Sequence, residues 1–448
     1  MIYSDKDLII NHPKKAINKL SIPIIISLLL ITVNALIDSA WVSGLGSDSL
    51  AAIGFVTPLI LIISSLGNGL GIGTNSIVSR CIGKGDDDNT SNAAVHSIIL
   101  TVGFSLVISL ISLIFLKNIL IFLGAGGVIS YASSYAGIIF AGIIFEYTSI
   151  VLAAIIRSEG AVNRAIYPLI ASTIINIIID PIFIYTLHLG IAGAALATII
   201  SSALSIIPLG YWIFIKKDTF VKVDFSKYRH NISIYWDIFT VGVPASIEMI
   251  IISFVTMFIN SLLVIIGGNM AVGAYGVAMR ILSVFLTPVS GIGVANITVV
   301  GTAFGAKLKE NIKTSFNYST KLSLIIAIFT FSFIVLFASN LASFFASDAT
   351  NDMNIYIIHL LYILSFSVFT IPLREIVFNI LQAMGKGITS LCLIILKELI
   401  FTICTYIFAF YLGLGSDGIY YGMLAGGTIG SAITFCYGYF YIKRLEFK

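Results

Sequence analysis

Twelve long apolar stretches divide this sequence, and each exceeds the roughly 20 residues that an α-helix needs to cross a bilayer. The stretches are continuous, not short and alternating, which favours helices over a β-barrel. Only 10% of the residues are charged and 58% are hydrophobic, whereas soluble proteins carry about 25% charged residues. We therefore expect an all-α polytopic membrane protein that lies in a lipid bilayer and binds no nucleic acid. The predicted spans lie near residues 17–45, 52–79, 93–123, 128–156, 165–187, 190–215, 233–266, 272–303, 314–345, 353–384, 388–412 and 416–442.

The basic residues predict how the spans are oriented. With an even number of spans both termini lie on one side, and this arrangement places 20 of the 25 basic residues there. The opposite loops hold only Lys117, and the other four basic residues fall within spans. Such asymmetry follows the positive-inside rule and predicts a multi-pass plasma-membrane protein with both termini cytoplasmic.

The two halves of the chain repeat one design. "SIPIIISLLL" opens the first span and "GVPASIEMII" the seventh, so that Pro23 and Pro244 are equivalent. Farther along, "IIRSEGAVNRA" and "ILQAMGKGITS" match at an offset of 225 residues. Six spans per half give a parallel repeat, with its axis along the membrane normal. We predict a six-helix lobe over residues 1–215, a cytoplasmic linker over 216–232 and a second six-helix lobe over 233–448. Two pseudo-symmetric bundles that face a central cavity are typical of transporters.

No catalytic or nucleotide-binding motif accompanies this architecture. The sequence lacks H-E-x-x-H, G-x-x-x-x-G-K-[ST] and G-x-S-x-G, and its histidines show no metal-ligand spacing. The glycine string "GNGLGIG", residues 67–73, fits helix packing better than phosphate binding. We therefore expect a protein that is not an enzyme, has no cofactor and draws any uphill transport from an ion gradient.

Two carboxylates lie inside predicted spans, where a charge costs at least about 2.5 kcal/mol. Asp38 is near the outer end of the first span, and Asp180 is in the outer half of the fifth. Each follows an asparagine by four residues, Asn34 and Asn176, and so shares a helix face with it. Such an oxygen-rich pocket can carry a proton between two sides, or hold a bare Na⁺. The competing interpretation is that Asp180 only caps a helix break or satisfies a neighbouring helix.

The proline after Asp180 suggests a hinge. Pro181 has no N–H, so the carbonyl of Ile177 loses its helical partner and the helix is expected to kink. The second half has no counterpart of the two aspartates, because Thr405 stands in the place of Asp180.

The second half carries other charges inside its spans. Lys397 and Glu398 are adjacent, so we expect them to point to different helix faces and to pair with other helices. Glu248, one turn after Pro244, is the best candidate there for substrate contact. We expect Asn34 and Glu248 to face the substrate cavity.

Several motifs in both halves resemble the multidrug and toxic compound extrusion (MATE) family, and look most like its prokaryotic DinF-type branch. Each motif is weak alone, but their order and spacing cover nearly the whole chain. The matching stretches are "IDSAWVSGLG", "SRCIGKGD", "IIRSEG", "NIIIDPIFIY", "LGIAGAALAT", "VGVPASIE" and "ILQAMGKG".

The resemblance implies a twelve-helix, two-lobe antiporter that expels organic, often cationic or amphipathic, small molecules in exchange for H⁺ or Na⁺; we expect a monomer. It implies an ion-coupling site in the N-terminal lobe, where Na⁺ is a candidate ligand. Another branch of the family uses an acidic pair in the C-terminal lobe, and that pair is not evident in this sequence. Asn34 is not part of what the resemblance implies and rests on the sequence spacing alone. The implied ion-coupling residues are Asp38, Asn176 and Asp180, with Tyr135, Thr198 and the carbonyl of Ala194 beside them; the implied Na⁺ ligands are Asp38, Asn176, Asp180 and Thr198.

The sequence leaves two other functions open. A lipid or polysaccharide flippase of the same superfamily would prefer a cationic cavity, for which Arg280 and Lys397 are candidates. An intramembrane enzyme would need a nucleophile or a metal cluster, and the sequence motifs offer neither.

Overall fold

Helices make up almost the whole computed structural model, which describes residues 2–346 and 350–447. The α-helices are α1 (Ile2–Asn11), α2 (Pro13–Ser43), α3 (Ser47–Lys84), α4 (Asp87–Phe122), α5 (Ile129–Ala141), α6 (Ile143–Ser158), α7 (Val162–Pro181), α8 (Ile191–Gly210), α9 (Ile232–Gly305), α10 (Lys309–Leu336), α11 (Ala338–Phe345), α12 (Asn351–Leu364), α13 (Ser367–Ala383), α14 (Gly387–Tyr406) and α15 (Gly415–Lys443). Short 3₁₀ turns form η1 (Ala125–Val128) and η4 (Phe225–Lys227), and π-helical turns form η2 (Ile182–Thr186), η3 (Tyr211–Lys216) and η5 (Ile407–Tyr411).

The described helices account for all twelve predicted spans. Nine are long and apolar enough to cross a membrane alone, and two bent pairs, α5 with α6 and α12 with α13, raise the number to 11. The 74-residue α9 supplies the twelfth span, because Gly268 interrupts it with φ 67° and ψ −168°. A left-handed φ is available to glycine at little cost, so the chain turns there between the predicted spans 233–266 and 272–303.

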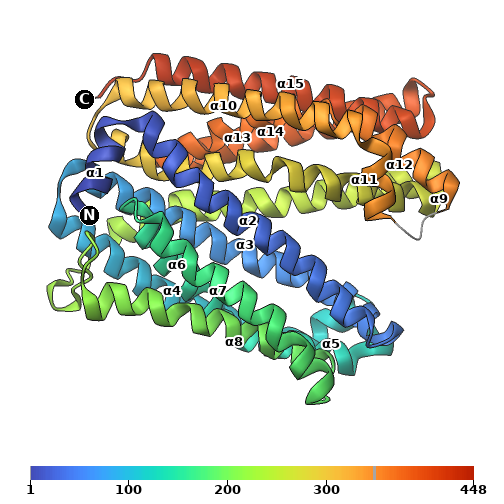
Figure 1. Ribbon diagram of the computed structural model, residues 1–448, viewed down its shortest axis with the longest axis horizontal. Coiled ribbons are helices and arrows are strands. Elements are labelled where there is room, and N and C mark those ends of the chain that lie inside the picture. Colours follow the sequence, from blue (N-terminus) through green and yellow to red (C-terminus); the bar gives the residue numbers. More distant parts are fainter. Residues whose placement is uncertain (1, 347–349, 448) are drawn as a thin grey trace.

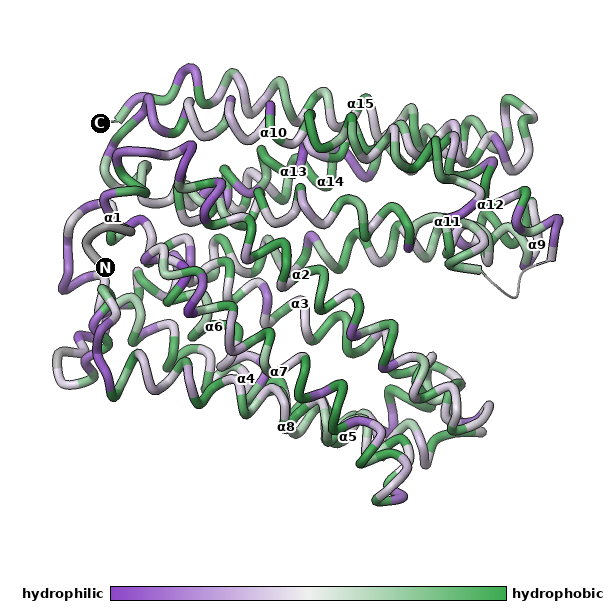
Figure 2. The backbone as a smooth tube through the Cα atoms, in the orientation of Figure 1, coloured by the Kyte–Doolittle hydropathy of each residue, from purple (hydrophilic) through white to green (hydrophobic). Residues whose placement is uncertain are grey.

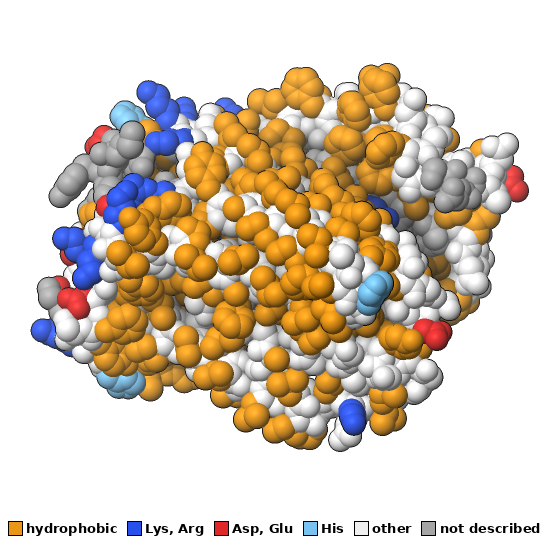
Figure 3. All heavy atoms as spheres, turned by 60° about the horizontal axis from the view of Figure 1, so that its bottom comes forward, with side chains coloured by type: hydrophobic (Ala, Val, Ile, Leu, Met, Phe, Trp, Pro, Cys, Tyr) orange, Lys and Arg blue, Asp and Glu red, His pale blue; other side chains and the backbone are white. Residues whose placement is uncertain are grey.

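The helices form two bundles. In Figure 1, α2–α8 make one bundle and α9–α15 the other; the bundles meet beside the two termini and diverge toward the opposite end. Hydrophilic residues gather at the end that carries the termini, whereas the middle of the helices is mainly hydrophobic (Figure 2). A broad hydrophobic surface lies between charged ends in Figure 3. This pattern suits a multi-pass membrane protein, and the exact lobe boundaries, residues 1–215, 216–232 and 233–448, stay a prediction.

Close backbone packing joins the two bundles near the termini. A Cβ at Gly83 of α3 would overlap the carbonyl oxygen of Thr302 on α9, so only glycine permits this approach. Within the "GNGLGIG" string, Gly69 approaches α9 in the same way. Ser76 Oγ donates to the carbonyl of Gln382 at 2.6 Å, and this bond also crosses between the bundles. The string therefore serves helix packing.

A π-helical turn lies directly after Pro181, where the sequence predicts a kink. Residues Val162–Thr186 form one continuous span, in which α7 passes into the π-helical turn η2 directly after Pro181. The equivalent turn, η5, follows Tyr406, which stands at the position of Pro181 in the second half. The π-helical turn therefore belongs to the duplicated scaffold and does not require the proline. A hinge at Pro181 stays a prediction.

The segment between the bundles packs on the first bundle. Glu159, 6% exposed, accepts a hydrogen bond from the backbone N–H of Val221 at 2.9 Å. Burial raises the pKa of this carboxyl group to about 7, although hydrogen bonds from the backbone oppose the shift. Arg164 forms an ion pair with Asp218 at 3.1 Å, and the backbone N–H of Asn231 donates to His96 Nε2 at 3.0 Å.

Candidate ion and substrate sites

The two predicted carboxylates meet between α2 and α7. The Asp38 and Asp180 carboxyl groups lie within hydrogen-bonding range of each other. Asn34 connects the two helices, because its Nδ2 donates to Asp38 Oδ2 and to Asn176 Oδ1, both at 2.9 Å. Asn176 Nδ2 in turn lies 3.4 Å from Asp180 Oδ1. The structure thus brings together both N-x-x-x-D pairs.

This cluster has more acceptor oxygens than donors. Asn34 Oδ1 and Asp38 Oδ1 are buried and have no hydrogen-bond partner among the described residues. An unpaired buried acceptor usually costs about 1–3 kcal/mol, and two carboxylates at close range repel each other if both are ionised. A proton or a Na⁺ ion would relieve both costs, so the donor set fits either ion.

The two carboxylates differ in access. Asp180 is 2% exposed and Asn176 4% exposed, and both lie behind the cavity wall. Asp38 lines the large cavity between the bundles. A cation that enters from this cavity would therefore meet Asp38 first.

Three further residues are expected beside this cluster: Tyr135, Thr198 and Ala194. Tyr135 is close enough to both aspartates to interact with their charges, and Tyr135 and Thr198 line the same cavity as Asp38. Thr198 Oγ1 donates to the carbonyl of Ala194 at 3.1 Å, so this carbonyl already has a partner on its own helix. Among the described residues, no group of three or more His, Cys, Asp or Glu side chains could hold a metal ion.

The large cavity has a volume of about 800 Å³ and draws residues from both bundles. Glu248 lines it and accepts a hydrogen bond from Gln382 Nε2 at 3.1 Å. Arg374 and Glu375 share this part of the wall. Apolar side chains, such as Ile60 and Met249, make up much of the remaining surface, so the cavity suits an amphipathic organic molecule.

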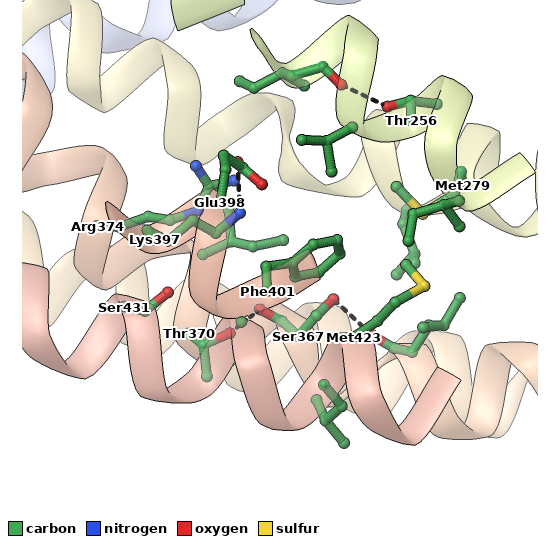
Figure 4. Close-up of a pocket in the computed structure, with 18 of the residues that line it drawn as sticks. Thr256, Met279, Ser367, Thr370, Arg374, Lys397, Glu398, Phe401, Met423 and Ser431 are labelled. Carbon is green, nitrogen blue, oxygen red and sulfur yellow. Dashed lines mark hydrogen bonds and ion pairs between the residues drawn. The ribbon is translucent and has the colours of Figure 1, made fainter. Parts of the chain in front are cut away.

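A smaller pocket of about 150 Å³ lies within the second bundle. Figure 4 shows Arg374, Lys397 and Glu398 at one end of it, with Phe401 and Met423 along the apolar part. Lys397 Nζ binds Glu398 Oε1 at 2.7 Å and lies 4.6 Å from the centre of the Phe401 ring.

The expectation that Lys397 and Glu398 point to different helix faces is therefore wrong. Their side chains are long enough to turn toward each other, and the low exposure of both, 7% and 5%, favours an ion pair over two separate buried charges.

Sequence reasoning missed one acidic residue of the cavity. Glu146 lies in the first turn of α6 and lines the large cavity, and its Oε1 accepts a hydrogen bond from Ser64 Oγ at 2.8 Å. The signal was present in the sequence, because Glu146 is a carboxylate inside the apolar stretch 128–156.

Comparison with known proteins identifies related sequences. The family model MatE matches residues 23–182 and 244–415, two segments that begin at the equivalent prolines Pro23 and Pro244. "Multidrug export protein MepA" of Staphylococcus aureus (strain MSSA476) is 30% identical over 270 residues, which are 60% of this chain and 59% of that protein. The chain thus spans less than two thirds of this relative. MepA of Staphylococcus saprophyticus is 26% identical over 425 residues, 93% of this chain and 91% of that protein.

Solved structures share the fold over nearly the full length. "Crystal structure of MATE in complex with MaL6" matches with a TM-score of 0.95 and 33% identity, and covers 98% of both chains. "Outward-facing conformation of a multidrug resistance MATE family transporter of the MOP superfamily" gives the same TM-score, identity and coverage.

Proposed function

The chain belongs to the MatE family of membrane transporters, and we propose that it exports organic small molecules, cationic or amphipathic, in antiport with H⁺ or Na⁺. The relatives named as multidrug export proteins support efflux over the flippase alternative. Membership of the DinF-type branch stays a prediction.

One observation carries the ion-coupling proposal. Beside the facing carboxyl groups of Asp38 and Asp180, the acceptors Asn34 Oδ1 and Asp38 Oδ1 are buried and receive no hydrogen bond from the part of the chain that the structure describes. If the site were only structural, these oxygens would be expected to have partners in the protein. A transported cation supplies the partner, and we propose Asp38, Asn176, Asp180 and Thr198 as its ligands, with Tyr135 and Ala194 beside them.

The position of Asp38 explains how ion and substrate would exchange. While Asp38 and Asp180 hold no cation, the cavity wall is negative and favours a cationic substrate. When a proton or Na⁺ binds the pair, this wall becomes more neutral and the substrate is released. Because binding linkage is reciprocal, the substrate weakens ion binding by the same factor.

Alternating access would come from rocking of the two bundles about the central cavity. The bundles meet beside the termini and diverge at the opposite end (Figure 1). With the termini cytoplasmic, as the basic loops predict, this arrangement opens the cavity to the outside.

We propose that Pro181 and the π-helical turn after it allow α7 to move when the cation leaves Asp180. We further propose that the protein acts as a monomer in the plasma membrane.

The test uses purified protein in liposomes, with a fluorescent organic cation as substrate. An imposed pH gradient and, separately, an imposed Na⁺ gradient should reveal which ion drives export. Asp38→Asn and Asp180→Asn should each reduce gradient-driven export to the level of protein-free liposomes. Glu310→Gln, an exposed charge on α10, is the matched control and should transport normally. Normal export by both aspartate variants would contradict the proposal.

A further inference from the structure

Glu146 is a carboxylate that lies at membrane depth. Among the described residues, no Lys, Arg or His nitrogen lies within 4.0 Å of it, and its only hydrogen-bond donor is Ser64. Intramembrane carboxylates usually pair or serve function. The ion site described above does not include Glu146, so its presence requires another explanation.

The local backbone holds Glu146 at the cavity. The span bends by 41° between α5 and α6, and the bend occurs at Gly142, where a Cβ would overlap the side chain of Ile199. Glu146 follows in the first turn of α6. The scaffold thus places a carboxyl group at this point of the cavity.

Glu146 lies deeper in the cavity than the aspartate pair. Asp38 is close to Ser43, the end of α2 that is remote from the termini. Glu146 lies much farther from Ile129, where α5 begins at the same end of the molecule. At about 1.5 Å of rise per residue, Glu146 is several turns farther toward the point where the bundles meet. The two acidic positions are therefore separate.

The surroundings of Glu146 indicate the kind of cation that fits. Ile60, Ile139 and Ile150 line the same cavity, and the volume of about 800 Å³ far exceeds that of a metal ion. Ser149, one turn along α6, is already paired with Ser205 at 2.6 Å, so its hydroxyl group is engaged within the protein. An organic cation needs fewer oxygen ligands and gains from the apolar walls.

We propose that Glu146 binds the positive charge of an amphipathic organic cation, while the aspartate pair holds the coupling ion. This assignment deepens the proposed export function and rests on it for its physiological meaning. It predicts that removal of the Glu146 charge affects charged substrates and spares neutral ones of the same shape.

The experiment is equilibrium binding to the purified full-length protein in detergent, without any ion gradient. The probes are tetraphenylphosphonium, a monocation, and triphenylphosphine oxide, a neutral compound of similar bulk. Glu146→Gln should weaken tetraphenylphosphonium binding about tenfold or more, because a close charge pair away from water is strong. Binding of the neutral probe should change less than twofold, and Glu146→Asp should restore much of the cation affinity.

Other outcomes overturn the assignment. Equal weakening for both probes would mean that Glu146 only shapes the cavity, and unchanged binding of the cation would remove it from the site. If Na⁺ competes with tetraphenylphosphonium in the parent protein and this competition alone disappears in Glu146→Gln, the residue is an ion ligand instead. Because no gradient is used, these results are independent of whether Asp38→Asn and Asp180→Asn abolish transport.

Discussion

Substitution of Gly83 by alanine should destabilise the state in which the bundles meet beside the termini. The added Cβ would overlap the carbonyl oxygen of Thr302 and lie 2.9 Å from the backbone nitrogen of Ala306, both near the end of α9. These are backbone atoms, so no side-chain rotation relieves the overlap. Overpacking of this kind costs about 1–3 kcal/mol, and each 1.4 kcal/mol corresponds to about a tenfold change in an equilibrium. The ratio of the joined state to the separated state should therefore fall about 5- to 150-fold.

The populations can be measured by double electron–electron resonance. Spin labels at Asp87 and Glu310, at the starts of α4 and α10, would report the separation of the two bundles after the native cysteines are replaced. Gly54→Ala on the same helix is the matched control, because a Cβ there meets no atom within 4 Å. Alanine favours helix over glycine by about 1 kcal/mol at either site, but this gain acts on both states and cancels in the ratio.

The expected result is a shift toward long distances in Gly83→Ala and an unchanged distribution in Gly54→Ala. Identical distributions in the parent protein and both variants would refute the claim that glycine packing between α3 and α9 holds this end closed.

Two further predictions concern residues outside the cavity. Burial raises the folded-state pKa of Glu159 to about 7 from 4.5, so folding binds a proton and stability should fall as pH rises from about 4.5 to 7, by at most about 3 kcal/mol. Thermal unfolding in detergent between pH 5 and 8 should show a weaker pH dependence in Glu159→Gln; an unchanged slope would contradict this. Pro181→Ala should retain the π-helical turn, since Tyr406 precedes the same turn in the second half, but should slow export if Pro181 is a hinge. Export at the parent rate by a well-folded Pro181→Ala would remove the hinge role.

The sequence predicted the membrane architecture well because long apolar runs and the duplicated motifs are properties of the chain itself. The twelve spans were correct, including the two that join in α9. The bends at Gly142 and before α13 were not predicted, since they depend on how neighbouring helices pack.

Some features of the candidate site were also predictable from the sequence, and others were not. The N-x-x-x-D spacing indicated Asn34 without help from any resemblance, and Asn34 connects Asp38 to Asn176 in the structure. The Lys397–Glu398 pair was predicted wrongly, because helix-face arguments ignore the reach of long side chains. The sequence predicted a distortion of the helix at Pro181 and assigned it to the proline. The same π-helical turn follows Tyr406 in the second half, so the turn itself is independent of the proline.

The most direct test of the central claim is whether substrate binding expels a cation from the aspartate pair. Purified protein in weakly buffered detergent would be titrated with tetraphenylphosphonium, while proton release is followed with a pH-sensitive dye and ²²Na⁺ release with a filter assay. The account predicts release of one of these ions by the parent protein and none by Asp38→Asn. Saturable binding of the substrate that displaces neither ion would contradict it.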